Sequence, residues 1–197
     1  MARRRTAIGQ AVRVRLTDPE LAGPTIRLRP WRPDDAPALA AAWADADVGT
    51  YTRVPDPATV ETATRWIAGW QTRADHGRAL DLVVSGAGDD EVWGEVGLGP
   101  IDWARHTAEI GFWIAAPQRN KGIATEAVTL LADWAVAELP LRHVVARVHP
   151  DHSRSWRVLA AAGFLRRGRL SSGHDLWDRA ARSSDRAGNP GAGGTGC

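Results

Sequence analysis

Short strands are indicated wherever apolar and polar residues alternate along the chain. Ile26 and Leu28 alternate with two arginines and are followed by Pro30 and Trp31. Such alternation places every second side chain on the same face of a strand. The pattern recurs in four later segments, 80–84, 92–98, 108–114 and 144–148, and Phe164 begins one more strand. We therefore expect a sheet of six to seven strands.

Apolar residues at helical spacing separate several of these strands. Helices are predicted over four segments, 34–46, 58–74, 122–138 and 153–162. The third ends at Pro140 and the fourth at Gly163, two residue types that stop helices. The resulting order, β-α-α-β-β-β-α-β-α-β, predicts an α+β fold: a mixed α/β domain whose mostly antiparallel, twisted sheet carries helices on both faces.

The two ends of the chain differ from its middle. Residues 1–23 contain a cluster of arginines and no clear periodicity, so we interpret them as a basic, partly flexible arm or a loosely attached strand. Residues 181–197 are rich in glycine and contain too little apolar surface to fold, which predicts a disordered tail. The folded unit is then a single domain over 24–180.

Composition narrows the classes of function. The chain has 197 residues, with 25 Lys and Arg against 23 Asp and Glu, a balance too even for a nucleic-acid binder. No apolar run is long enough for a membrane helix. Cys197 is the single cysteine, and the six histidines lack the spacing of a metal site, so no metal is expected. No apolar stretch follows the first arginines, which favours a cytoplasmic protein.

The segment most informative about chemistry is the polar turn over 117–124, between a predicted strand and a long helix. A helix N-terminus presents unpaired backbone N–H groups and a partial positive charge. Here Arg119, the single lysine Lys121 and Gly122 precede it. This combination suits a phosphate or a pyrophosphate. It matches neither the P-loop nor the dinucleotide fingerprint, and a plain polar loop is the alternative.

The spacing Arg119-x-x-Gly122-x-Ala124 resembles the [Gln/Arg]-x-x-Gly-x-[Gly/Ala] motif of the GNAT N-acetyltransferases. Three more segments, 28–31, 108–113 and 149–155, resemble the strands and helix of the RimJ/RimL-type branch, which acetylates protein N-termini among other amines. The likeness runs from about residue 25 to about 170. It implies the GNAT fold, with the fourth and fifth strands splayed apart.

The resemblance implies acetyl-coenzyme A (acetyl-CoA) as the donor. Its pyrophosphate would lie on the N–H groups of residues 119–124, and its pantetheine arm would run between the splayed strands. A bulge near Gly111 would help to separate them. The residues expected to bind coenzyme are Phe112, Trp113, Ile114, Arg119, Asn120, Lys121, Gly122, Ile123, Ala124 and His152.

Three features depart from the family pattern. Asn120 stands where many relatives have glycine, although asparagine tolerates positive φ well. His152 replaces the usual asparagine near the coenzyme arm, and a histidine can become charged, which makes coenzyme affinity pH-dependent. Residues 171–180 are short and polar where the family has a long apolar strand, so the last hairpin is doubtful.

Two residues are candidates for the acetyl-transfer chemistry. Glu109, on the opposite strand face from Ile110, is the expected general base, directly or through a water molecule. The alternative is that Glu109 only pairs with an arginine such as Arg147, and Glu95 is a rival base. Ser155 would lie near the sulfur, as the resemblance implies, and assist the leaving thiolate; simple helix capping is its alternative.

Acceptor-side residues are harder to assign. Trp31 and Tyr51 are our candidates, and the other tryptophans of the first third, at 43, 66 and 70, suit either an acceptor pocket or the core. We expect an N-acetyltransferase that moves acetyl directly from acetyl-CoA to a primary amine. The amine belongs to a protein N-terminus or to a small molecule.

One further reading stays open. The alternative function is a non-catalytic, regulatory acyl-CoA-binding module with the same fold, motivated by His152 and the polar final segment. The partners expected are an amine acceptor, with no nucleic acid and no membrane. Homodimers are common in the branch that the chain resembles, but the sequence names no interface.

Overall fold

The structure is a computed structural model of the chain, and it describes residue 16 and residues 19–181. Segments 1–15, 17–18 and 182–197 lie outside the described residues. Most of the predicted basic arm and the predicted tail therefore cannot be compared with the structure. The described sheet begins at Leu21, slightly before the expected domain boundary at residue 24.

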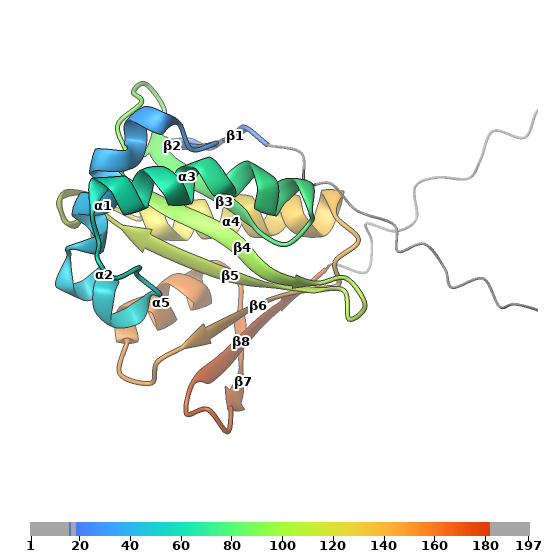
Figure 1. Cartoon of the computed structure of the whole chain (residues 1–197). Helices are drawn as coiled ribbons and strands as arrows, with labels where there is room; N and C mark the ends of the chain where they lie inside the picture. The colour runs from blue at the N-terminus through green and yellow to red at the C-terminus, as the bar shows by residue number, and fades with distance from the viewer. Residues whose placement is uncertain (1–15, 17–18, 182–197) are drawn as a thin grey trace, which may run out of the picture.

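The described residues form eight strands, five α-helices and two short 3₁₀ helices (Figure 1). The strands are β1 (Leu21–Ala22), β2 (Ile26–Arg29), β3 (Leu80–Gly86), β4 (Gly94–Asp102), β5 (Thr107–Ile114), β6 (His143–Val148), β7 (Leu165–Arg169) and β8 (Asp175–Ala180). The helices are α1 (Ala36–Trp43), α2 (Ala46–Tyr51), α3 (Val60–Asp75), α4 (Ile123–Glu138) and α5 (Ser153–Ala161), with 3₁₀ turns at Pro33–Asp35 and Ala116–Gln118. The expected α+β class is confirmed.

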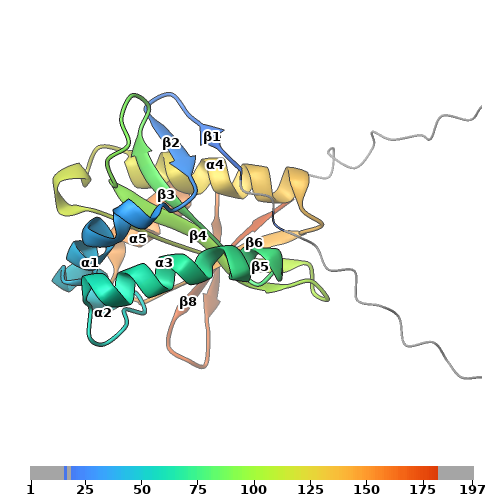
Figure 2. The same cartoon turned by 45° about the horizontal axis from the view of Figure 1, so that its top comes forward.

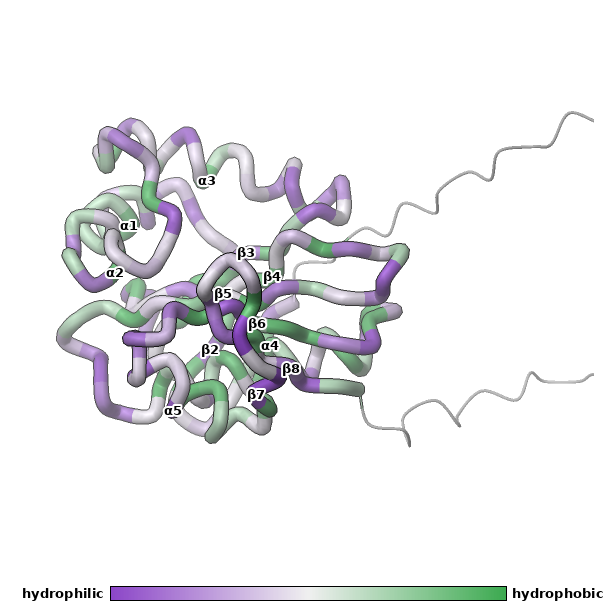
Figure 3. Tube along the Cα trace, turned by 90° about the horizontal axis from the view of Figure 1, so that it is seen from below, coloured by the Kyte–Doolittle hydropathy of each residue, from purple (hydrophilic) through white to green (hydrophobic). Residues whose placement is uncertain are grey.

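One sheet in the order β1-β2-β3-β4-β5-β6-β8-β7 forms the middle layer of the molecule. Its neighbouring strands are antiparallel except for β5 and β6, which are parallel. Helices α1 and α3 lie on one face and α4 and α5 on the other (Figures 1 and 2). Seen along the sheet, apolar segments gather in this middle layer, because both faces of the sheet are covered (Figure 3).

The alanine-rich segment predicted as one helix over 34–46 is divided, and that prediction was wrong. Asp45 has an extended backbone between α1 and α2, and its Oδ1 accepts hydrogen bonds from the N–H groups of Asp47 and Val48. An aspartate in this conformation is a favoured N-cap, which starts a new helix. The break therefore changes the direction of the chain and gives the short helix α2.

The last hairpin is present, although the polarity of its sequence had put it in doubt. All six residues of β8 pair with β6, and Trp177 is buried. The buried carboxylates Asp175 and Asp178 form ion pairs with the arginines of β7. Arg166 and Arg169 contact Asp175, and Arg167 contacts Asp178. Cross-strand ion pairs thus replace the apolar side chains that the family pattern led us to expect.

The irregularity in the central strands is not at Gly111, where we expected a bulge. Gly111 pairs regularly with Gly97, and the register shifts instead on β4, between Leu98 and Ile101. The extra residue therefore belongs to β4, next to the start of the β5–β6 pair.

The connection from β2 to α1 depends on a buried ion pair. Arg29 is 1% exposed, and its two terminal nitrogens donate to the two carboxylate oxygens of Asp35 at 2.8 and 2.9 Å. It also donates to the carbonyl oxygens of Pro30 and Asp90. A bidentate pair with these extra acceptors fixes the start of α1 against the sheet.

Replacing Arg29 should destabilise the fold strongly. The Arg29→Met variant leaves the buried Asp35 carboxylate without its cation, which costs about 3–5 kcal/mol when a buried pair loses one partner. Urea denaturation measures the loss of unfolding free energy. Arg27→Met, on the more exposed pair with Asp90, is the matched control and should cost at most about 1 kcal/mol. Equal losses in both variants would contradict this account.

Candidate active site

The central strands β5 and β6 separate along their length and open a cleft. They pair only from Thr107 to Glu109 on β5 and from His143 to Val145 on β6. Beyond Glu109 the two strands diverge, and Ile114 and Val148 both line a cleft of about 1190 Å³. The edge of β5 that turns away from β4 has lost its partner there, so its peptide groups can bind a ligand. The expected splayed strand pair is confirmed.

A backbone cradle borders one end of this cleft, where α4 begins. Asn120 and Gly122 both have positive φ, at 62° and 81°, and Gly122 is the N-cap of α4 without a side-chain cap. The first N–H groups of α4 have no partner inside the helix. Residues 118–120 and 122–125 line the cleft. Their N–H groups and the helix dipole suit an anion.

The Arg119 side chain is engaged elsewhere in this structure. Its Nε donates to the carbonyl oxygen of Ile114 at 2.8 Å, and its two terminal nitrogens contact Asp47 and Asp45 at 2.9 and 3.0 Å. Asp47 also contacts Arg154 of α5 at 2.8 Å. Arg119 thus links the cradle to α2 rather than pointing as a free cation at an anion. Pairs between residues more than 70 positions apart leave no local signal in the sequence.

Lys121 also lacks the position expected of an anion-binding residue. It is exposed, and its Nζ donates to Oε1 of Gln118 at 2.8 Å. The positive potential of the cradle therefore comes mainly from backbone N–H groups and from the start of α4.

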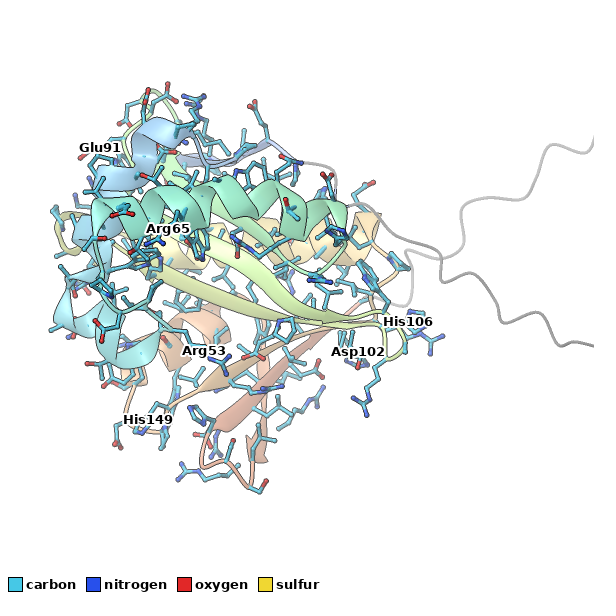
Figure 4. The ribbon with its side chains drawn as sticks, in the orientation of Figure 1. Arg53, Arg65, Glu91, Asp102, His106 and His149 are labelled. Atoms are coloured by element: carbon cyan, nitrogen blue, oxygen red, sulfur yellow. The ribbon has the colours of Figure 1, made fainter. Side chains whose placement is uncertain are left out.

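Glu109 lies where the two strands begin to separate. Its side chain is half-buried, lines the cleft and contacts Arg147 of β6 at 3.4 Å. Burial raises the pKa of Glu109, while the positive charges of Arg147, Arg53 and His174 oppose that rise. Arg53, which follows α2 and is labelled in Figure 4, also lines the cleft. The pairing with Arg147 that we had weighed as an alternative is real, and it leaves the carboxylate in the cleft.

Two more carboxylates that line the cleft share the face of Glu109, and one of them, Asp81, was missed in the sequence. Glu95 pairs in register with Trp113, and Asp81 with Gly97, so these side chains and Glu109 lie on the sheet face under α3. All three line the cleft. Alternation within each strand could have placed each residue on a face, but only the register between strands brings the three together.

The aromatic residues divide between the core and the cleft. Trp31 is 3% exposed and lies behind Trp66, with its ring edge-on to that ring at 5.8 Å. Trp43 and Trp66 line the cleft and meet edge to face at 6.3 Å. Trp70 is buried. The acceptor-side candidate Trp31 thus acts on the cleft only through Trp66.

Comparison with known proteins agrees with this geometry. A model described as "Acetyltransferase (GNAT) domain" matches residues 25–165, most of the described chain. The chain belongs to the GNAT family. It is 38% identical over 117 residues to the probable N-acetyltransferase YjcK of Bacillus subtilis, covering 59% of this chain and 65% of YjcK, just under two thirds of that relative.

Two further proteins extend the comparison. The uncharacterized N-acetyltransferase p20 of Bacillus licheniformis is 30% identical over 145 residues, which are 74% of this chain and 82% of p20. A solved structure of Mycobacterium smegmatis RimJ in complex with CoA-disulfide superposes with a TM-score of 0.70 at 27% identity, covering 79% of this chain and 82% of RimJ. The RimJ/RimL likeness expected from the motifs is confirmed.

His152, the residue that departs from the GNAT pattern, contacts both sides of the cleft. Its Nδ1 lies 2.9 Å from Oγ of Ser155, and its ring stacks on Tyr51 with 3.8 Å between centroids and an angle of 3°. Ser155 is buried, whereas Tyr51 is exposed on α2, and all three line the cleft. His152 therefore lies in the cleft and forms a hydrogen bond with the expected catalytic serine.

The other expected coenzyme residues lie along the same GNAT cleft. Phe112, Trp113 and Ile114 come from β5, and Ile123 and Ala124 from the first turn of α4. Within the described ranges, no group of three or more metal-ligating side chains is close enough to hold an ion, and no helix is long and apolar enough to cross a membrane.

Replacing His152 should change how the stability of this GNAT protein depends on pH. Burial lowers the pKa of His152 below its usual value of about 6.5, helped by Arg154 and His149 and opposed by Asp47. The unfolded chain then binds more protons, so stability falls as pH drops below about 6.5 toward the lower folded value.

The His152→Asn variant removes that contribution. Urea denaturation of the wild type and the variant between pH 5 and 8 should show the two unfolding free energies diverging as the pH changes. The wild type should lose more stability than the variant on acidification. Parallel curves would mean that the pKa of His152 does not differ between the folded and unfolded states.

Proposed function

We propose that this protein is an N-acetyltransferase that moves the acetyl group directly from acetyl-CoA to a primary amine. One observation carries the proposal: the anion cradle at the start of α4 and the carboxylate face with Glu109 open onto the same cleft, on the two sides of the separated strands. The family membership supports the class of reaction, and the CoA bound to the related RimJ supports the donor.

The cradle would bind the pyrophosphate of acetyl-CoA. The N–H groups of residues 119–124 supply donors, and the dipole of α4 favours negative charge. The pantetheine arm would then run past Phe112–Ile114 and place the thioester between β5 and β6. A backbone N–H of the unpaired β5 edge near Ile114 can donate to the carbonyl oxygen as negative charge develops on it.

The acceptor must attack as a neutral amine, and Glu109 would accept its proton directly or through water. An α-amino group with a pKa near 7.8 is roughly one seventh neutral at pH 7, whereas a lysine amine costs about 4.6 kcal/mol to deprotonate. A carboxylate with a raised pKa is a better base than an ordinary one. This favours an N-terminal or similarly weakly basic amine.

The coenzyme leaves as a thiolate when the C–S bond breaks. Ser155 Oγ would donate a hydrogen bond to that sulfur, and His152 Nδ1 holds the hydroxyl in place at 2.9 Å. Because thiols ionise near pH 8.5, this assistance is modest. The cytoplasmic location and a homodimer remain predictions.

A charge placed in the cradle should abolish coenzyme binding without harming the helix. In Ala124→Glu the new carboxylate sits in the first turn of α4, where it suits the helix dipole, but it repels the pyrophosphate. Isothermal titration with acetyl-CoA should show at least a tenfold weaker Kd.

The matched control is Ala137→Glu, on the exposed far end of the same helix, which should bind acetyl-CoA like the wild type. If Ala124→Glu binds as tightly as that control, the coenzyme does not use the cradle.

Glu109→Gln separates an enzyme from a binding module. Loss of the base should lower kcat by about a hundredfold or more while the Kd for acetyl-CoA stays within about twofold. Coenzyme release during amine acetylation, followed with a thiol reagent, gives kcat. A wild type that binds acetyl-CoA but acetylates neither peptides nor small amines would favour the non-catalytic, regulatory acyl-CoA-binding module.

A further inference from the structure

Asp81, Glu95 and Glu109 form a carboxylate wall on the sheet face under α3. The three side chains have different partners. Asp81 contacts Arg73 of α3 at 3.1 Å, and Glu109 contacts Arg147 at 3.4 Å. Glu95 lies between them across the strands. In the part of the chain that the structure describes, no arginine, lysine or histidine forms an ion pair with Glu95. Glu95 is therefore the carboxyl group of this wall that lines the cleft without an ion-pair partner.

Arg73 is one of the two cations that the wall already holds, and its contacts show which chemistry this face provides. The guanidinium of Arg73 lies 4.3 Å from the ring centre of Trp66 and pairs with Asp81. An aromatic face and a carboxylate together are the usual partners of an organic cation. Glu95 and its cross-strand neighbour Trp113 again place a carboxyl group beside an indole, one strand further, where the indole N–H donates to the carboxyl group.

The surroundings of Glu95 favour a cationic ligand on electrostatic grounds as well. Burial and the nearby Asp81 carboxylate raise the pKa of Glu95 to about 8, while Arg73 and the indole N–H of Trp113 oppose the rise. Glu109, on β5, is a further carboxylate on this face of the sheet that lines the cleft. Near pH 7 Glu95 therefore carries its proton in the free protein. A positive charge arriving beside it stabilises the ionised form, so Glu95 releases this proton when a cation binds.

We propose that Glu95, flanked by Trp113, binds the acceptor amine in its ammonium form and so selects acceptors that enter the cleft as cations. The acceptor class is then a primary ammonium next to an apolar group, which would rest against Trp43 and Trp66. This inference rests on the proposed function, because it places the acceptor in the same cleft. It separates two tasks: Glu95 recognises the ammonium ion, and Glu109 accepts the proton during transfer.

The first test measures acceptor binding and catalysis separately. Glu95→Gln keeps the shape of the side chain but cannot ionise when an ammonium arrives, so it should weaken acceptor binding and leave coenzyme binding alone. Isothermal titration of phenethylamine into the protein–CoA complex should show at least a tenfold weaker Kd for the variant. In turnover assays the acceptor KM should rise by a similar factor, with kcat within about threefold of the wild type.

Two controls show whether the effect is specific to Glu95 and whether the variant is folded. Glu91→Gln removes an exposed carboxylate far from the cleft, on the opposite side of the molecule from His149, and should change nothing (Figure 4). An unchanged Kd of Glu95→Gln for acetyl-CoA shows that the variant is folded. A tetrapeptide with a free N-terminus forms a second arm, and its N-acetylated form, which lacks the ammonium, should not bind.

The outcomes are distinct. Amine or peptide binding that is lost in Glu95→Gln supports the inference even if the wild type turns over neither, a result that would instead count against the proposed function. The inference is overturned if Glu95→Gln binds the acceptor like the wild type, if the neutral peptide binds as well as the free one, or if neither cation binds the wild type. A fall in kcat with an unchanged acceptor KM also overturns it, because Glu95 would then act in proton transfer.

Discussion

The separation of β5 from β6 is the constraint on which the rest of this structure depends. Parallel strands normally continue to pair, and here pairing stops after Glu109 and Val145. The break exposes one edge of β5 in the interior of a covered sheet, and it connects the two faces of that sheet. Acetyl-CoA bound at the start of α4 and an amine bound under α3 can therefore meet at the carbonyl group of the acetyl.

Helix α2 joins the two sides of this opening. Asp47 bridges Arg119, beside the cradle, and Arg154, on α5, while Tyr51 at the other end of α2 stacks on His152. Each ion pair is partly exposed and individually weak. Together with the stacked rings they fix the position of α2 over the cleft. The acceptor side of the cleft is therefore positioned by contacts with residues on the coenzyme side.

Much of the fold could be predicted because it is encoded locally. The long helix α4 and the alternating strand β5 carry strong periodicity, and the motif around Gly122 marks the helix start. What could not be predicted depends on pairing over long distances. The partners of Arg119 and the neighbours of Glu95 follow from strand register and from the break at Asp45, and neither is visible in a single stretch of sequence.

A crystal structure of the protein with bound coenzyme A tests the central claim most directly. The account predicts that the pyrophosphate lies on the N–H groups at the start of α4. The thiol should lie in the gap between β5 and β6, next to Ser155 and on the way to Glu109. Coenzyme bound outside the gap, or β5 and β6 paired along their full length around it, would contradict the claim that the separated strands form the site of acetyl transfer.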